Sequence, residues 1–242
     1  EHKLMRLVAD MELRGMRVDV SYAEQLAERM TQEEQNCKDI AKELGVSNVN
    51  ATRDVAAALQ NLGVDLIETT EKSGDLKVDK MILTNIANDP SLGKACDLAN
   101  AVMSAKNNAK WRDAYVIGCL ELMDSNARVH PMINALGART GRMSISNPPL
   151  QQLPSGNDAI RRMFLAEEDC RMASIDFSGV ELRVLAALSQ DPVMLKVFRE
   201  GGDLHQMTAD TTGISRKLAK TVNFGKVYGG GPKGLARQTG LS

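Results

Sequence analysis

Aromatic residues are scarce in this 242-residue sequence, and long apolar runs are missing. Phe, Trp and Tyr make up 3% of the chain, although hydrophobic residues make up 43% and Met contributes 13 residues. A core of Leu, Val, Ile, Ala and Met favours helices over an aromatic-rich β-sandwich. No apolar run approaches the roughly 20 residues of a membrane-spanning helix, and the first residues do not resemble a secretory signal. We therefore expect a cytoplasmic chain without a membrane partner.

Cysteine is also sparse, and its four positions lie far apart: Cys37, Cys96, Cys119 and Cys170. No pair forms a C-x-x-C motif and no His lies beside any of them at ligand spacing. Neither a zinc site nor a disulfide framework is indicated. We expect four reduced thiols.

The small net charge of −1 conceals a difference between the two halves of the chain. Residues 1–130 carry a net charge of −5, and residues 131–242 carry +4. The second half is therefore the expected anion-binding part.

The first half reads as helices separated by turns. Ser21 and Glu24 form a capping-box pattern ahead of an apolar stripe that stops at Gly45, which predicts one long helix. The same kinds of signal predict helices over 51–62, 78–87 and 91–117, and a polar turn over 69–75. None of these segments carries a pattern of catalytic groups, so a helical arm with solvated charged faces is the expectation.

The pattern changes after about residue 127. Residues 128–133 and 171–176 read as short strands, and residues 138–154 as an extended polar stretch. Helices then resume, with start signals at Asp191 before Pro192, at Asp203 and at Ser215. The predicted fold class is α+β and mostly helical.

Asp176 is the first residue of chemical interest. It follows an apolar strand-like segment and precedes a helix, a favoured place for Mg²⁺, which needs only one or two carboxylates and completes its shell with phosphate and water. A second interpretation is purely structural, because Ser178 and Glu181 fit a capping box at the start of that helix.

The segment 215–231 gives the strongest signal. Arg216, Lys220, Phe224 and Tyr228 are four residues apart, so they fall within about 120° of one helical face. Cations near a helix start suit a polyphosphate, and an aromatic ring one or two turns later can stack on a base. A solvated basic end above a core aromatic stripe would produce the same spacing.

Other polar residues are weaker candidates. Thr140, Arg142 and Gln151 lie on irregular backbone, where they could reach base edges or phosphates. His205 lies two residues after a helix cap and could contact a phosphate. Taken singly, ordinary loop and surface polarity explains all four.

Read together, these segments resemble the family A DNA polymerases. Residues 176–183, DFSGVELR, resemble the first palm motif, D-[YF]-S-x-[IV]-E-L-R. Residues 216–229 resemble the fingers-helix motif, R-x3-K-x2-N-[FY]-G-x2-Y-G. Residues 140–154 resemble the primer-template segment between thumb and palm, 203–205 match D-[IL]-H, and 11–19 resemble the helix and turn ahead of the thumb.

The resemblance implies a partial right-hand polymerase from a bacterial cell or a phage-infected host. Its parts would be a palm-entry helix over 1–20, a helical thumb over 21–117, the first part of the palm with a small antiparallel sheet over 118–190, and the helical start of the fingers over 191–242. Its partners would be primer-template DNA and deoxynucleoside triphosphates, and its cofactor two Mg²⁺ ions.

The resemblance also implies residue roles. Asp176 would bind both metal ions with help from the Phe177 carbonyl, and Lys220 would also protonate the leaving pyrophosphate. Glu181 would exclude a 2′-hydroxyl. The remaining assignments are His205, Arg216 and Lys220 to the triphosphate, Phe224 to the nucleotide, Tyr228 to the template position, and Thr140, Arg142 and Gln151 to the primer-template.

Three departures from the family pattern limit these implications. Gly179 stands where many members have Gln, and the connection 210–215 is shorter than usual. The sequence also contains no His-Asp-Glu, the palm motif that supplies the second metal-binding Asp. We therefore expect part of a polymerase, completed on the same chain or by a second one. The alternative is a non-catalytic primer-template or nucleotide-binding module that works only in an assembly.

Overall fold

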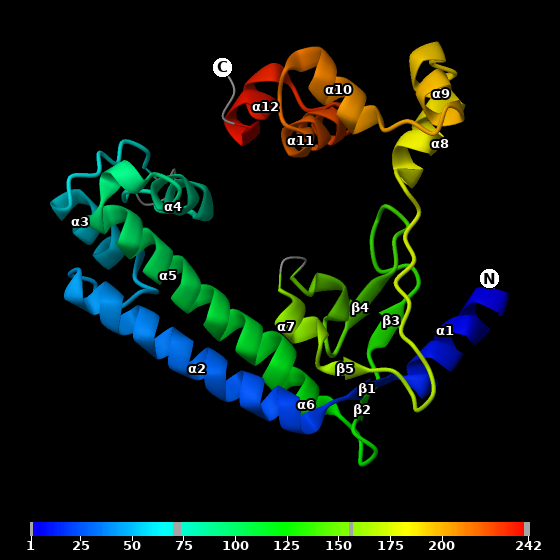
Figure 1. Cartoon of the computed structure of the whole chain (residues 1–242), viewed down its shortest axis with the longest axis horizontal. Coiled ribbons are helices and arrows are strands. Elements are labelled where there is room, and N and C mark those ends of the chain that lie inside the picture. The colour runs from blue at the N-terminus through cyan, green and yellow to red at the C-terminus, as the bar shows by residue number, and fades with distance from the viewer. Residues whose placement is uncertain (1, 70–73, 155–156, 240–242) are drawn as a thin grey trace. The chain divides into compact units, whose positions relative to one another are not determined.

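The computed structural model describes residues 2–69, 74–154 and 157–239. They form two compact units, one ending at Met172 and the other starting at Ala173. Both are rich in helix, and the sheets are small and antiparallel (Figure 1), so the predicted fold class is confirmed. The domain boundaries predicted at 20, 117 and 190 stay predictions. No helix in the described part of the chain is long and apolar enough to cross a membrane.

Two long helices dominate the first unit and lie side by side (Figure 1). They are α2 (Val20–Glu43) and α5 (Lys94–Trp111), and α5 continues through a π-helical turn, η2 (Arg112–Ile117), into α6 (Gly118–Leu122). At one end they pack with α3 (Thr52–Asn61), α4 (Lys80–Ala87) and the short η1 (Pro90–Leu92) around a first core that contains Leu59, Leu98 and Val102. Helices α2, α3 and α4 confirm the predicted ones to within about two residues, whereas the helix predicted over 91–117 begins at Lys94 and continues to Leu122.

The other end of the two long helices meets a second core and a sheet. This core contains Met30, Val116 and Ile160. The sheet has the strand order β2-β1-β5, in which β1 (Met16–Val18) pairs on its two edges with β2 (Arg128–Val129) and β5 (Phe164–Leu165). Helix α1 (His2–Arg14) directly precedes β1 in the sequence, and helix α7 (Asp158–Arg161) directly precedes β5.

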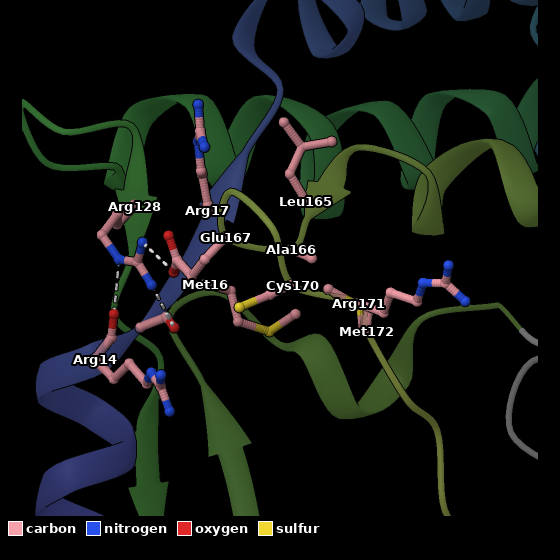
Figure 2. A pocket seen from close by; sticks show the side chains of 11 residues that line it. Arg14, Met16, Arg17, Arg128, Leu165, Ala166, Glu167, Cys170, Arg171 and Met172 are labelled. Atoms are coloured by element: carbon pink, nitrogen blue, oxygen red, sulfur yellow. Dashed lines mark hydrogen bonds and ion pairs between the residues drawn. The ribbon is translucent and has the colours of Figure 1, made fainter.

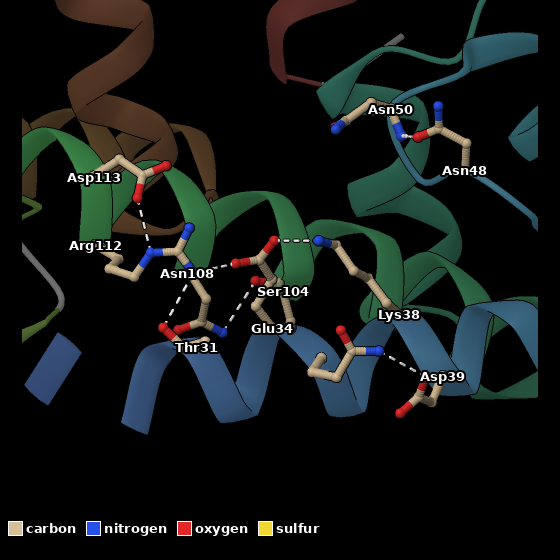
Figure 3. A network of polar contacts seen from close by, with 11 residues as sticks. Thr31, Glu34, Lys38, Asp39, Asn48, Asn50, Ser104, Asn108, Arg112 and Asp113 are labelled. Carbon is tan, nitrogen blue, oxygen red and sulfur yellow. Dashed lines mark hydrogen bonds and ion pairs between the residues drawn. The ribbon is translucent and has the colours of Figure 1, made fainter. Parts of the chain in front are cut away.

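Between the two cores, the interface of α2 with the end of α5 is polar. Glu34 is buried there and accepts hydrogen bonds from Arg112 and Lys38 (Figure 3). Burial works to raise the pKa of Glu34, but the hydrogen bonds from Lys38 and Arg112 outweigh it and lower the pKa below the ordinary 4.5. We call this polar interface around Glu34 the joint between the cores. Its carboxylate is ionised and is paired with Lys38 and Arg112.

Three local predictions are wrong. Asp19, not Ser21, caps α2, because its carboxylate accepts the Tyr22 amide at 3.1 Å. The single strand predicted over 128–133 is two strands in different sheets, since β3 (Met132–Asn134) pairs with β4 (Ser144–Ser146) and not with β1. The strand predicted over 171–176 pairs with no other strand in the described residues.

Two further predictions agree with the structure only in part. The turn predicted over 69–75 has its middle, 70–73, outside the described residues. The polar stretch 138–154 is less uniform than predicted, because it contains β4 and a 3₁₀ turn, η3 (Leu150–Gln152).

The second unit contains five helices in its described part: α8 (Val180–Ser189), α9 (Pro192–Arg199), α10 (Leu204–Thr212), α11 (Arg216–Val227) and α12 (Pro232–Thr239). The predicted caps of α9, α10 and α11 are confirmed. Asp191, Asp203 and Ser215 each accept a backbone amide of the first turn with their side chains. Gly213 ends α10 in the left-handed region, at φ 71°.

Candidate nucleotide-binding site

Helices α10 and α11 pack against each other and bring a basic side chain to the cap of its neighbour. Arg216 donates from Nε and Nη2 to one oxygen of Asp203, at 2.8 and 2.6 Å. Burial works to raise the pKa of Asp203, but the hydrogen bonds from Arg216 and from two backbone amides outweigh it and lower the pKa. One carboxylate therefore caps α10 and holds the first cation of α11.

The imidazole of His205 lies in the interface between these helices. The residue is 7% exposed, and its ring centroid lies 5.4 Å from that of Phe224. Burial is the main cause that lowers the pKa of His205, and the charges of Arg216 and Lys220 lower it further, against the opposing effect of Asp203. The ring is therefore neutral near pH 7. The surface position considered for His205 is wrong.

The four residues predicted to share a face of α11 border this interface. Phe224 stacks on Tyr228 with ring centroids 6.4 Å apart, and Arg216 and Lys220 are exposed near the helix start. Lys220 makes no hydrogen bond or ion pair within the described residues, so its ammonium is available to a ligand. The arrangement places two cations, a neutral imidazole and two stacked rings along α11.

The start of α8 is linked to the end of α11 through Glu181. The Tyr228 hydroxyl donates to a Glu181 carboxylate oxygen at 3.0 Å. The N-cap of α8 is Gly179, in the left-handed region at φ 60°, and no side chain caps this helix. The capping-box interpretation of Ser178 and Glu181 is therefore wrong, and the Glu181 carboxylate is directed to Tyr228.

Asp176 and Phe177 lie on an exposed, irregular segment that leads into α8. In the described part of the chain the Asp176 carboxylate has no hydrogen bond or ion pair, and no group of three Asp, Glu, His or Cys residues there could hold a metal ion. Asp176 and the Phe177 carbonyl can offer a divalent cation part of a coordination shell. Such a part suits Mg²⁺, which takes many of its ligands from water and phosphate.

The residues predicted to contact DNA lie in the other unit. Thr140 and Arg142 are exposed on the loop that joins β3 to β4. Gln151, in η3, donates to the carbonyl of Met143 at 3.3 Å, so its side chain reaches the end of the same loop. Helix α11 and this loop belong to different units, and each forms its own surface.

A cavity of about 370 Å³ in the first unit is lined by four arginines but by none of the predicted site residues. Arg128 donates to Glu167 and to the carbonyls of Arg14 and Gly15. The side chains of Arg14, Arg17 and Arg171 point away from one another (Figure 2). The cavity therefore presents no convergent set of cations to an anion.

Sequence reasoning missed the contacts of three residues that organise the α10–α11 interface. Asp203 is the partner of Arg216. Asn223 forms hydrogen bonds with both Thr208 and His205. A signal for Asn223 was present. It lies seven residues after Arg216, only about 20° around the helix, and therefore on the same face.

Comparisons with known proteins agree with the motifs. The family model described as DNA polymerase family A matches residues 19–242. The chain is 42% identical over 243 residues to a DNA polymerase of Mycobacterium phage L5 and 33% identical over 256 residues to DNA polymerase I of Synechocystis sp.. Both alignments cover all of this chain, but only 40% and 25% of those relatives.

A solved structure has the same fold. It is the POL domain of Pol1 from M. smegmatis in complex with DNA primer-template and dNTP, with a TM-score of 0.81 at 24% identity. The match covers 98% of this chain and 43% of that one, so the chain spans less than half the length of each of these proteins. On the family match and these identities, the chain belongs to DNA polymerase family A.

Proposed function

We propose that the chain forms the thumb, the first palm section and the beginning of the fingers of a polymerase that adds deoxynucleotides to a primer 3′-hydroxyl. The observation that carries this proposal is the α10–α11 surface, where Arg216, Lys220 and the neutral His205 lie beside the stacked rings of Phe224 and Tyr228. Because the relatives are phage and bacterial enzymes, the proposed setting is the cytoplasm of a bacterial or phage-infected cell.

Spacing along α11 supports the assignment of roles. A rise of 1.5 Å per residue puts Arg216 and Phe224 about 12 Å apart along the axis, roughly the length from the terminal phosphate of a triphosphate to its sugar and base. Arg216 and Lys220 then bind phosphate oxygens, as His205 does through a ring N–H. Phe224 lies against the nucleotide, and Tyr228 holds the template position.

In this proposal Glu181 discriminates between ribose and deoxyribose nucleotides. Its carboxylate is held by Tyr228 and does not cap α8. A carboxylate held beside the sugar crowds a 2′-hydroxyl and leaves room for a deoxyribose.

Asp176 and the Phe177 carbonyl are the proposed metal ligands of this chain. Bound Mg²⁺ would lower the pKa of the primer hydroxyl and stabilise the leaving pyrophosphate, which Lys220 is placed to protonate. Two ions need a second carboxylate, which we assign to polymerase sequence beyond these residues, on the same or a second chain. Without it, the lone Asp176 favours a second role for these residues, as a nucleotide- or primer-template-binding module.

Thr140, Arg142 and Gln151 are the proposed primer-template contacts. They are exposed polar side chains on and beside one loop. An Arg on such a loop can pair with phosphates or with minor-groove acceptors, and the amide of Gln151 can donate to base edges.

The experiment compares two lysines on the same helix. Lys226 is exposed like Lys220 but is turned about 120° around the helix from Lys220, outside the arc that runs from Arg216 to Tyr228. Loss of a charge-assisted phosphate contact is worth about 1.5 to 3 kcal/mol, so Lys220→Ala should weaken binding of dATP with Mg²⁺ by some 10 to 150-fold in calorimetric titrations. Lys226→Ala should change it less than about twofold. Equal effects of the two changes would contradict the proposal.

A further inference from the structure

A chain of hydrogen bonds runs through the α10–α11 interface. The Thr208 hydroxyl donates to the Leu204 carbonyl at 2.9 Å, one turn earlier in α10. The Thr208 oxygen also lies 3.2 Å from Asn223 Oδ1, and since both of these carbonyl oxygens can only accept, they share the single hydroxyl proton of Thr208. The Thr208 oxygen is therefore left as an acceptor, and Asn223 Nδ2 lies 3.0 Å from it.

The amide nitrogen of Asn223 lies within hydrogen-bond distance of both Thr208 and His205. This nitrogen has two N–H groups: one donates to Thr208, and the other points to His205 Nδ1 at 3.1 Å. A ring nitrogen that accepts carries no proton. The one proton of the neutral imidazole is therefore on Nε2.

We infer that Asn223 is a positioning residue of the nucleotide site: anchored by Thr208, it holds His205 in the Nε2–H tautomer, so that Nε2 donates a hydrogen bond to a phosphate oxygen of the bound nucleotide. The inference rests on the proposed function, because it needs a phosphate at this surface. The inference adds Asn223 to the site, with the role of fixing which ring nitrogen of His205 carries the proton.

The other ring nitrogen is open to a ligand. Nε2 has no hydrogen-bond partner among the described residues, yet no buried side-chain nitrogen or oxygen there lacks one, so Nε2 reaches solvent. The charged groups that face the ring are Asp203 at the start of α10, and Arg216 and Lys220 on α11. An anion attracted by the two cations meets Nε2 beside them.

The tautomer of His205 decides whether the contact between Nε2 and a phosphate oxygen is favourable. With the proton on Nε2, the neutral ring donates to a phosphate oxygen. With the proton on Nδ1, a lone pair would face the phosphate, and both would be acceptors. Because burial and the two cations keep the pKa of His205 low, protonation of the ring does not supply the missing donor near pH 7.

The first test reads the tautomer directly by ¹⁵N NMR of the histidine rings in the 242-residue chain. The sequence contains three His, and His2→Gln and His130→Gln variants assign the signals. We expect an unprotonated Nδ1 and a protonated Nε2 for His205. Asn223→Asp puts an acceptor opposite Nδ1, so it should protonate Nδ1 and raise the pKa of the ring. A wild-type ring protonated at Nδ1 would overturn the inference.

The second test measures dATP affinity with Mg²⁺ in a matched pair that leaves the net charge unchanged. Thr208→Val keeps the shape but removes the anchor of Asn223, and should weaken binding at least threefold. Thr208→Ser keeps the hydroxyl and should bind like wild type. Asn223→Asp should weaken binding at least tenfold at pH 8 and less at pH 6, where the ring with its raised pKa becomes doubly protonated and Nε2–H returns.

These outcomes separate the inference from the proposed function. A wild-type chain that does not bind dATP overturns both. Binding that depends on Lys220 but is unchanged by Thr208→Val and Asn223→Asp overturns the inference alone. A change in fold cannot imitate the expected result, because the ring ¹⁵N signals report the tautomer in the folded protein, and Thr208→Ser restores what Thr208→Val removes.

Discussion

The polar joint between α2 and α5 allows a stability prediction to be worked from the structure (Figure 3). The Glu34 side chain is 10% exposed and lies 2.5 Å from Arg112, whose side chain is 20% exposed. Arg112→Leu removes the cation and leaves the buried carboxylate with Lys38 as its remaining cationic partner. Breaking a buried pair costs about 3 to 5 kcal/mol. Because Lys38 stays, we expect a loss of about 2 to 3 kcal/mol at pH 7.

Two variants show whether the loss comes from the buried charge. Arg53 pairs with Asp75, but its side chain is 81% exposed, so Arg53→Leu should destabilise the fold far less than Arg112→Leu. The double change Glu34→Leu with Arg112→Leu removes both charges and should recover most of the loss, because apolar groups of similar size can replace a buried pair at little cost.

The assay is urea unfolding followed by fluorescence. The single Trp of the chain, Trp111, directly precedes Arg112 and reports on the joint itself. The pH dependence has a definite sign. Because the folded pKa of Glu34 is lowered, the pair stabilises the fold above about pH 4.5, and this contribution is lost as the pH falls through the folded pKa. An Arg112→Leu loss no larger than that of Arg53→Leu, or a loss equally large at pH 4, would refute the reasoning.

Three further predictions concern single side chains. Gly15 and Gly63 both have positive φ, but a Cβ at Gly15 would lie 2.5 Å from the Val129 carbonyl oxygen, while one at Gly63 would meet nothing within 4 Å. Measured by urea unfolding, Gly15→Ala should therefore reduce the free energy of unfolding by at least about 2 kcal/mol and Gly63→Ala by about 1. Equal losses for the two variants would contradict the clash. Glu181→Ala should cost less than about 0.5 kcal/mol, since it caps no helix, and should relax ribonucleotide exclusion in a complete polymerase; unchanged sugar selectivity would count against the discriminator role. Arg142→Ala should reduce the slope of log affinity for duplex primer-template against log salt by about 1, and an unchanged slope would mean that this side chain makes no phosphate contact.

Helix starts were predictable where the signal lies within one turn. Asp191, Asp203 and Ser215 each bond an amide two or three residues ahead, so the cap and its partner are read in one short window. The same reasoning failed at Gly179, because the capping-box pattern there competes with a glycine that enters the left-handed region without strain.

Strands were less predictable because their partners are remote in the sequence. Met16 pairs with Val129, more than a hundred residues later, and Met132 pairs with Ser146. Local alternation therefore could not show that the apolar run 128–133 divides between two sheets. In the candidate site, the spacing along α11 predicted the residues of one face, whereas the partners supplied by α10 depend on packing between helices.

The π-helical turn Arg112–Ile117 has a consequence for how this chain changes over evolutionary time. A turn closed by i→i+5 hydrogen bonds holds one residue more than an α-helical turn. Loss of one residue within it would give an ordinary α-helix and leave the apolar faces on both sides in place. The same loss within α5 would turn the residues before it by about 100° and carry Leu98 and Val102 out of their core. We therefore expect natural insertions and deletions in this helix to collect at the turn.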